Sequence, residues 1–122
     1  MDRARDLESL EVIPKAEVAC ELWIDGAWIP ATEGEAFSVP ALGMEGAVFF
    51  SCRDTAAESE FGVSPLFVVA EHGSGSLIPT GGKREAREDA VKDALKFFLA
   101  SPNRSQAWEM MKALAQSRRV NL

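Results

Sequence analysis

The sequence predicts a single α+β domain over residues 1–122: an antiparallel β-meander of four or five strands packed against two C-terminal α-helices. Strand-like segments occupy residues 18–72, and long stretches of helical periodicity follow over residues 83–119. Hydrophobic residues make up 47% of the chain and charged residues 26%, as expected of a folded domain with a core. The composition therefore excludes a wholly disordered chain.

The first two strands are expected to form a hairpin. Residues 18–25 alternate apolar and polar side chains with a period of two, which is typical of a half-buried strand. Asp25-Gly26 follows, a dipeptide suited to a two-residue turn with positive φ angles. In this register Trp23 is expected to face Trp28 across the hairpin.

Three further strands are expected to complete the meander. A loop at residues 32–35 precedes a short strand at 36–39, and the sheet-favouring segments 46–54 and 64–72 form the last two strands. Residues 54–60 are interpreted as a polar connection between these last two strands.

Helices are expected at the two ends of the chain. A short N-terminal helix is expected over residues 2–11, and a Gly/Ser-rich loop at residues 72–82 leads to an amphipathic helix over residues 83–100. Pro102 ends that helix, and Asn103 begins a second one that continues to the basic residues near the C-terminus.

The last two strands are expected to be covered on both faces. Each carries large apolar side chains at successive positions, such as Phe49 and Phe50, whereas a sheet with one solvated face shows clean alternation. The C-terminal helices can cover one face. Three candidates remain for the other: a second copy of the chain, a different protein, or an N-terminal segment with the apolar residues Leu7, Leu10, Val12 and Ile13.

This surplus of apolar surface leads to the first functional hypothesis, a non-enzymatic protein-interaction domain that can self-associate. A role as an immunity protein, a chaperone or an inhibitor of a basic protein would suit the formal net charge of −6. Tryptophan is enriched at binding hot spots, and large exposed apolar patches usually mark interaction surfaces. The predicted interaction residues are Trp23, Trp28, Phe49 and Phe67.

The alternative hypothesis is a small-anion or nucleotide-binding domain. The Gly-rich segment before the first C-terminal helix would place free backbone N–H groups and basic side chains at a helix start, a natural anion site. Its candidate residues are Thr80, Gly81, Gly82, Lys83 and Arg84. The segment lacks the P-loop pattern, because Leu77 stands at the position of the first glycine and Arg84 at the position of the Ser or Thr.

Catalysis and metal binding find little support in the sequence. The chain has no CxxC pair and no Cys/His cluster, so a structural zinc site has no ligand set, and no cofactor is expected. Cys52 and His72 should lie at opposite ends of the last hairpin, about 23 Å apart at the usual rise of a strand. Both cysteines are interpreted as small buried hydrophobes.

The remaining predictions concern location and partners. No apolar run approaches the roughly 20 residues needed to span a bilayer, and residues 1–12 lack the apolar core of a signal peptide. We therefore expect a cytoplasmic, acidic protein with no membrane association. The net negative charge also disfavours nucleic-acid binding, and basic residues on the last two helices are interleaved with acidic ones.

Overall fold

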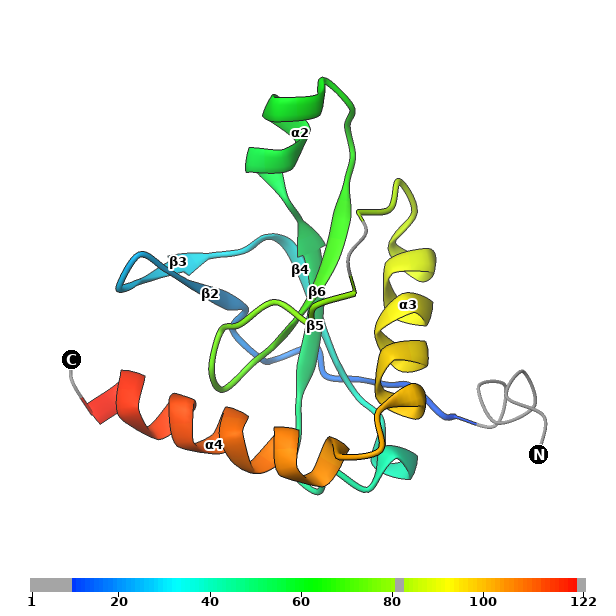
Figure 1. Ribbon diagram of the computed structural model, residues 1–122. Coiled ribbons are helices and arrows are strands. Elements are labelled where there is room, and N and C mark those ends of the chain that lie inside the picture. The colour runs from blue at the N-terminus through cyan, green and yellow to red at the C-terminus, as the bar shows by residue number, and fades with distance from the viewer. Residues whose placement is uncertain (1–9, 81–82, 121–122) are drawn as a thin grey trace.

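The computed structural model describes residues 10–80 and 83–120 and confirms the predicted α+β class (Figure 1). A four-stranded antiparallel sheet has the order β1–β4–β5–β6, and a separate hairpin pairs β2 with β3. The expected N-terminal helix falls mostly on residues 1–9, outside the described residues. The strands are β1 (Ile13–Pro14), β2 (Glu21–Ile24), β3 (Ala27–Pro30), β4 (Thr32–Ser38), β5 (Phe49–Arg53) and β6 (Phe67–Glu71). The helices are the 3-10 turn η1 (Pro40–Leu42), α2 (Thr55–Phe61), α3 (Arg87–Ala100) and α4 (Arg104–Val120).

The β2–β3 hairpin has the predicted turn and register. Asp25 and Gly26 adopt φ angles of 50° and 80°, and Trp23 pairs with Trp28 across the hairpin. A two-residue turn with both φ angles positive matches the twist of the flanking strands, which is why Asp-Gly favours it. The prediction for this hairpin is confirmed.

The prediction of a loop at residues 32–35 is wrong, because these residues belong to β4. Thr32 pairs with Arg53 and Glu35 pairs with Ser51, and a bulge lies between Thr32 and Glu35. Within the bulge, Glu33 has a φ angle of 52°. The polar residues and glycine of this segment therefore form a β-bulge within a strand, and they do not separate two strands.

The connection after β5 contains a helix that the sequence interpretation missed. Asp54 caps α2, since its side chain accepts a hydrogen bond from the backbone N–H of Ala57 at 3.0 Å. Gly62 ends the helix in the left-handed conformation, with φ of 67°. An aspartate N-cap and a glycine C-cap eight positions apart are the signals that could have identified this short helix.

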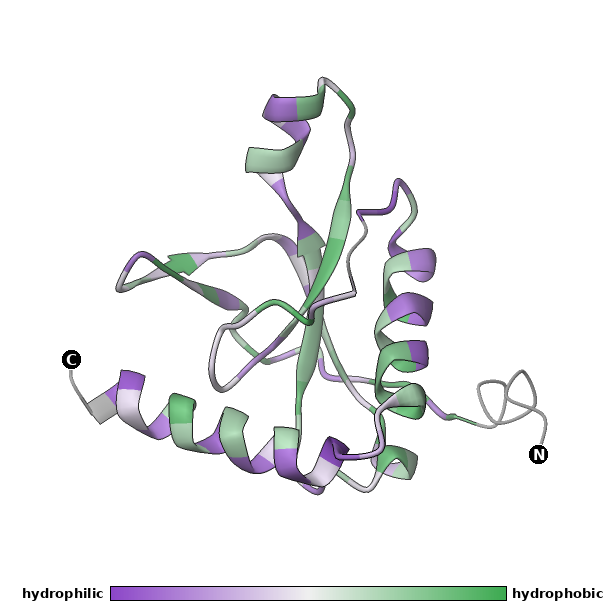
Figure 2. Ribbon diagram, viewed as in Figure 1, coloured by the Kyte–Doolittle hydropathy of each residue, from purple (hydrophilic) through white to green (hydrophobic). Residues whose placement is uncertain are grey.

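Helix α3 covers one face of the sheet, and Trp108 and Met111 of α4 pack against the same core cluster. Helix α3 begins at Arg87 and not at residue 83 as expected, and it buries Ala90, Ala94, Leu95 and Phe98. These side chains pack with Phe49 and its neighbours on the sheet. The ribbon shows α3 on one side of the sheet, with its apolar side turned inward (Figure 2). Helix α4 instead runs past the end of the sheet toward the hairpin (Figure 1).

The opposite face of the sheet is covered by the β2–β3 hairpin and the residues that flank it. The hairpin lies across the sheet from α3 (Figure 1). The prediction that both faces are covered is therefore confirmed, and the cover on this face is the hairpin, which was not among the three predicted candidates. The sequence analysis places the hairpin within the meander, whereas it forms a separate layer over the sheet. Five buried sheet residues pack against this cover: Ala36, Phe50, Cys52, Val68 and Ala70; the cover contributes Val18, Cys20, Leu22 and Ala31.

Candidate functional site

The four predicted interaction residues do not form one surface. Phe49 is only 2% exposed, packs against Phe98 with ring centroids 5.2 Å apart, and belongs to the core beneath α3. Phe67 lies on the same side of the sheet, half-buried, with the Arg87 guanidinium 4.6 Å from its ring centroid. Phe49 is therefore removed from the candidate site, and Phe67 lies apart from the two tryptophans.

Trp23 and Trp28 form an edge-to-face pair, with ring centroids 5.2 Å apart. Both are half-buried, because the last turns of α4 place Arg119 3.8 Å from the Trp28 ring centroid and Arg118 5.4 Å from that of Trp23. Arg118 also donates hydrogen bonds to the Ser74 carbonyl and to Ser76 Oγ. Cation–π contacts of this kind hold α4 against the hairpin.

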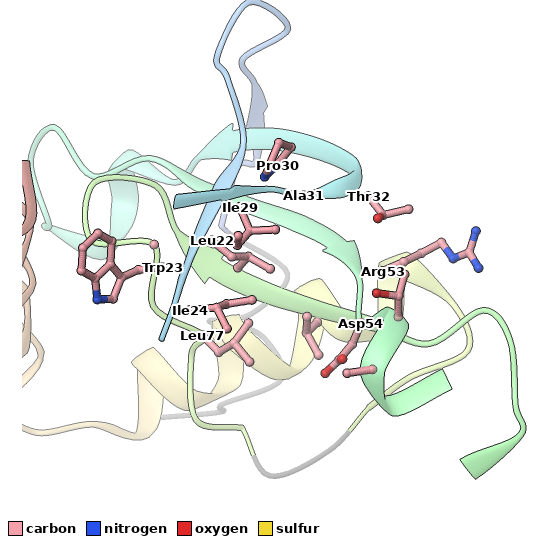
Figure 3. Close-up of a pocket in the computed structure, with 14 residues that line it drawn as sticks. Leu22, Trp23, Ile24, Ile29, Pro30, Ala31, Thr32, Arg53, Asp54 and Leu77 are labelled. Carbon is pink, nitrogen blue, oxygen red and sulfur yellow. The ribbon is translucent and has the colours of Figure 1, made fainter. Parts of the chain in front are cut away.

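An apolar groove opens between the β2–β3 hairpin and the edge of the sheet (Figure 3). Its volume is about 210 Å³. Three large aliphatic side chains at its mouth are partly exposed: Ile24 is 47% exposed, Ile29 43% and Leu77 43%. Leu22 and the buried Val68 also line the groove, and Trp23 lies at one end of it (Figure 3).

Only Trp23 among the predicted interaction residues lines this groove. The three aliphatic residues at the mouth were not predicted, although two sequence signals were available. Leu77 is a large apolar residue in a Gly/Ser-rich loop, and Ile29 pairs with Leu22 and so shares a face of the hairpin with Leu22 and Ile24. Leu77 reaches the site because it forms a β-bridge with Ala70 along the free edge of β6.

The other end of the groove is polar and is built around Arg53. Its guanidinium donates two hydrogen bonds to Glu58, at 2.8 and 2.6 Å, and one to Glu33 at 3.0 Å. The hydrogen bonds from Arg53 and from the Leu66 backbone N–H lower the pKa of Glu58 to about 2, so it stays ionised at neutral pH. Asp54 lines the same end and pairs with Lys83 at 3.1 Å.

Other surface features lack this combination of an apolar floor and a half-exposed aliphatic rim. A hollow beside residues 38–48 and another between His72 and α4 contain none of the large exposed hydrophobic residues. Met110 on α4 and Phe61 on α2 are more exposed, at 66% and 63%, but neither lines any of these three cavities. The groove is therefore the strongest candidate site among the described residues.

The residues of the alternative anion site are placed differently from the expectation. Helix α3 begins at Arg87, so Lys83 and Arg84 precede it and do not lie in its first turn. The carboxylates of Asp54 and Asp93 already pair with these two cations, the latter at 2.6 Å through Arg84 Nε. Thr80 donates its backbone N–H to the carbonyl of Ile78. Gly81 and Gly82 lie outside the described residues.

The cysteines are held in their protonated form. Burial raises the pKa of Cys52 to about 11 and also raises the pKa of Cys20, whereas the nucleophilic form of cysteine is the thiolate. Cys52 pairs with Val68, and the backbone N–H of His72 donates to the carbonyl of Val48. Four residues along the chain separate Val68, the partner of Cys52, from His72, which corresponds to about 13 Å. This distance is shorter than the expected separation of about 23 Å, but it is still too long for a thiol–imidazole pair.

Two other kinds of site are absent from the described part of the chain. Within residues 10–80 and 83–120, no group of three or more His, Cys, Asp or Glu side chains is arranged to hold a metal ion. Over the same residues, no helix combines the length and apolar character needed to cross a membrane. Comparison with known proteins found no matching family model, no similar curated protein and no similar solved structure.

Proposed function

We propose that this chain is a non-enzymatic protein-interaction domain that binds an apolar side chain of its partner in the groove between the hairpin and β6. The observation that carries the proposal is the rim of half-exposed Ile24, Ile29 and Leu77 around a cavity of about 210 Å³. For comparison, a cavity of about 150 Å³ holds a benzene molecule. A branched aliphatic side chain therefore has room there.

The arrangement of the groove supports binding more than chemistry. Its charged groups are at one end, where Arg53 is bound by two carboxylates and Asp54 by Lys83. Most of the remaining lining residues are apolar (Figure 3). Small-molecule and peptide sites are typically lined in this way, with few polar groups fixing the orientation of what binds.

Selection from a random peptide library, with the intact protein as bait, tests the proposal. We expect peptides that share a leucine, isoleucine or valine, because burying such a side chain contributes about 1.5–3 kcal/mol. The variants Ile24→Asp and Ile29→Asp should each weaken binding of a selected peptide at least tenfold, measured by calorimetry.

Met110→Asp is the matched control, since Met110 is more exposed than either isoleucine and lies outside the groove. It should leave the affinity unchanged. The proposal fails if the selected peptides share no apolar residue, or if Met110→Asp weakens binding as much as Ile24→Asp while both variants unfold at the wild-type urea concentration.

A further inference from the structure

The groove is built from a strongly acidic part of the chain. Residues 16–82 contain one basic residue, Arg53, and ten acidic ones. Every residue that lines the groove falls within this segment. The ten are Glu17, Glu21, Asp25, Glu33, Glu35, Glu45, Asp54, Glu58, Glu60 and Glu71. The acidic excess of the chain thus falls in the segment that supplies the groove lining, because the other twelve of its thirteen Lys and Arg residues lie outside this segment.

Ion pairs within the fold leave an excess of negative charge at the polar end of the groove. Arg53 is shared by Glu58 and Glu33, and Lys83 offsets Asp54, so three carboxylates face two cations. Glu33 is the most available of them, with its side chain 57% exposed. Among the described residues, only its Oε2 atom has a hydrogen-bond partner, which leaves Oε1 open to a further donor.

The other end of the groove already has its own cation. Arg118 lies over Trp23 and is anchored by the Ser74 carbonyl and Ser76 Oγ. A partner cation is therefore favoured beside Thr32, Glu33 and Asp54, and disfavoured beside Trp23. This asymmetry gives the occupant a direction along the groove.

The size of the groove favours a short segment over a second copy of the chain. The exposed apolar area of Ile24, Ile29 and Leu77 is roughly 200–300 Å², because each side chain exposes less than half of its surface. A stable protein–protein interface buries about 800 Å² on each partner. A second copy would also bring another acidic surface toward this one, since the net charge is −6. Both considerations disfavour self-association through this site.

We propose that the groove takes a short basic segment of a protein partner, with a branched aliphatic side chain among Ile24, Ile29 and Leu77 and a lysine or arginine beside Glu33 and Asp54. This assignment rests on the proposed function and adds the charge and direction of the ligand. The apolar part supplies most of the affinity, and the cation supplies selectivity between partners.

Three capped eight-residue peptides test the assignment by calorimetry in 50 mM salt. The first has a central leucine followed by two lysines, the second replaces the lysines with glutamates, and the third keeps the lysines but replaces leucine with asparagine. We expect the first to bind about tenfold more tightly than the second, and this ratio to fall toward one in 1 M salt, where charges are screened. The third should bind at least tenfold more weakly than the first.

Two variants locate the cation. Glu33→Gln should lower the affinity for the lysine–leucine peptide about threefold. It should not lower the affinity for the glutamate–leucine peptide. Glu109→Gln is the matched control, because Glu109 is 70% exposed on α4 and remote from the groove lining. It should leave the affinity for both peptides unchanged.

Each outcome separates the two proposals. Equal binding of the lysine and glutamate peptides, with both sensitive to Ile24→Asp, would overturn the basic ligand and leave the groove in place. Equal binding of the leucine and asparagine peptides would overturn the groove itself. A protein that dimerises at micromolar concentration, and that Ile24→Asp makes monomeric, would assign the site to a second copy and overturn the basic ligand. The basic ligand would also be overturned if the lysine–leucine peptide did not bind at millimolar concentration.

Discussion

Replacing Gly75 with alanine is expected to destabilise the protein by about 2–5 kcal/mol. Gly75 has a φ angle of 68°, and the left-handed conformation costs a residue with a Cβ atom about 1–2 kcal/mol. A Cβ atom at this position would also lie 2.6 Å from the backbone nitrogen of Trp23 and 2.6 Å from Cζ3 of Trp28. Neither the backbone nor the packed indole can yield cheaply, so overpacking adds about 1–3 kcal/mol.

Gly26→Ala is the control for the conformational part of this effect. Gly26 has a φ angle of 80°, but a Cβ atom there would meet nothing within 4 Å. It should cost only about 1–2 kcal/mol. Urea denaturation followed by tryptophan fluorescence measures both variants. Equal losses for the two alanine variants would show that the close packing of loop 73–76 against the hairpin does not contribute to stability.

Replacing Phe50 with alanine is expected to cost about 3–5 kcal/mol, the usual range for a fully buried phenylalanine. Phe50 is 0% exposed and lies on the face of β5 that packs against the hairpin. Its loss would leave a cavity between sheet and hairpin. Domains of this size are stable by only about 5–15 kcal/mol, so the variant would be close to unfolding.

Phe61→Ala is the matched control for this substitution, because Phe61 is 63% exposed at the end of α2. Its effect should stay within about 0.5 kcal/mol. Thermal and urea unfolding of the two variants give the comparison. If Phe50→Ala cost no more than Phe61→Ala, the hairpin would not form a packed layer on this face.

The elements with strong local signals were predictable from the sequence. Asp25-Gly26 specifies its turn through the φ angles it tolerates, and the apolar period of α3 identifies its buried face. The short helix α2 was missed because its seven residues show no apolar period. Only its capping residues, Asp54 and Gly62, indicate a helix. The bulge in β4 resembles a loop in sequence, because its polar residues and glycine are also typical of loops.

The candidate site was harder to predict, because it depends on how separate elements pack. Period-two alternation showed that Phe49 and Phe50 face opposite sides, but not which element covers each side. The hairpin was assigned to the sheet, whereas it folds over the sheet as a second layer. That arrangement brings Ile24 and Ile29 beside Leu77, a residue 48 positions after Ile29 in the sequence.

The most direct test of the groove is methyl NMR of the intact protein during titration with the tightest peptide from the library selection. Methyl signals of Ile24, Ile29, Leu22 and Leu77 should shift together and saturate with a single dissociation constant, because these side chains share one cavity. The methyl signals of Met110 and Leu114, which are exposed on α4, should stay in place. Shifts centred on Met110 and Leu114, with the groove methyl signals unchanged, would contradict the account.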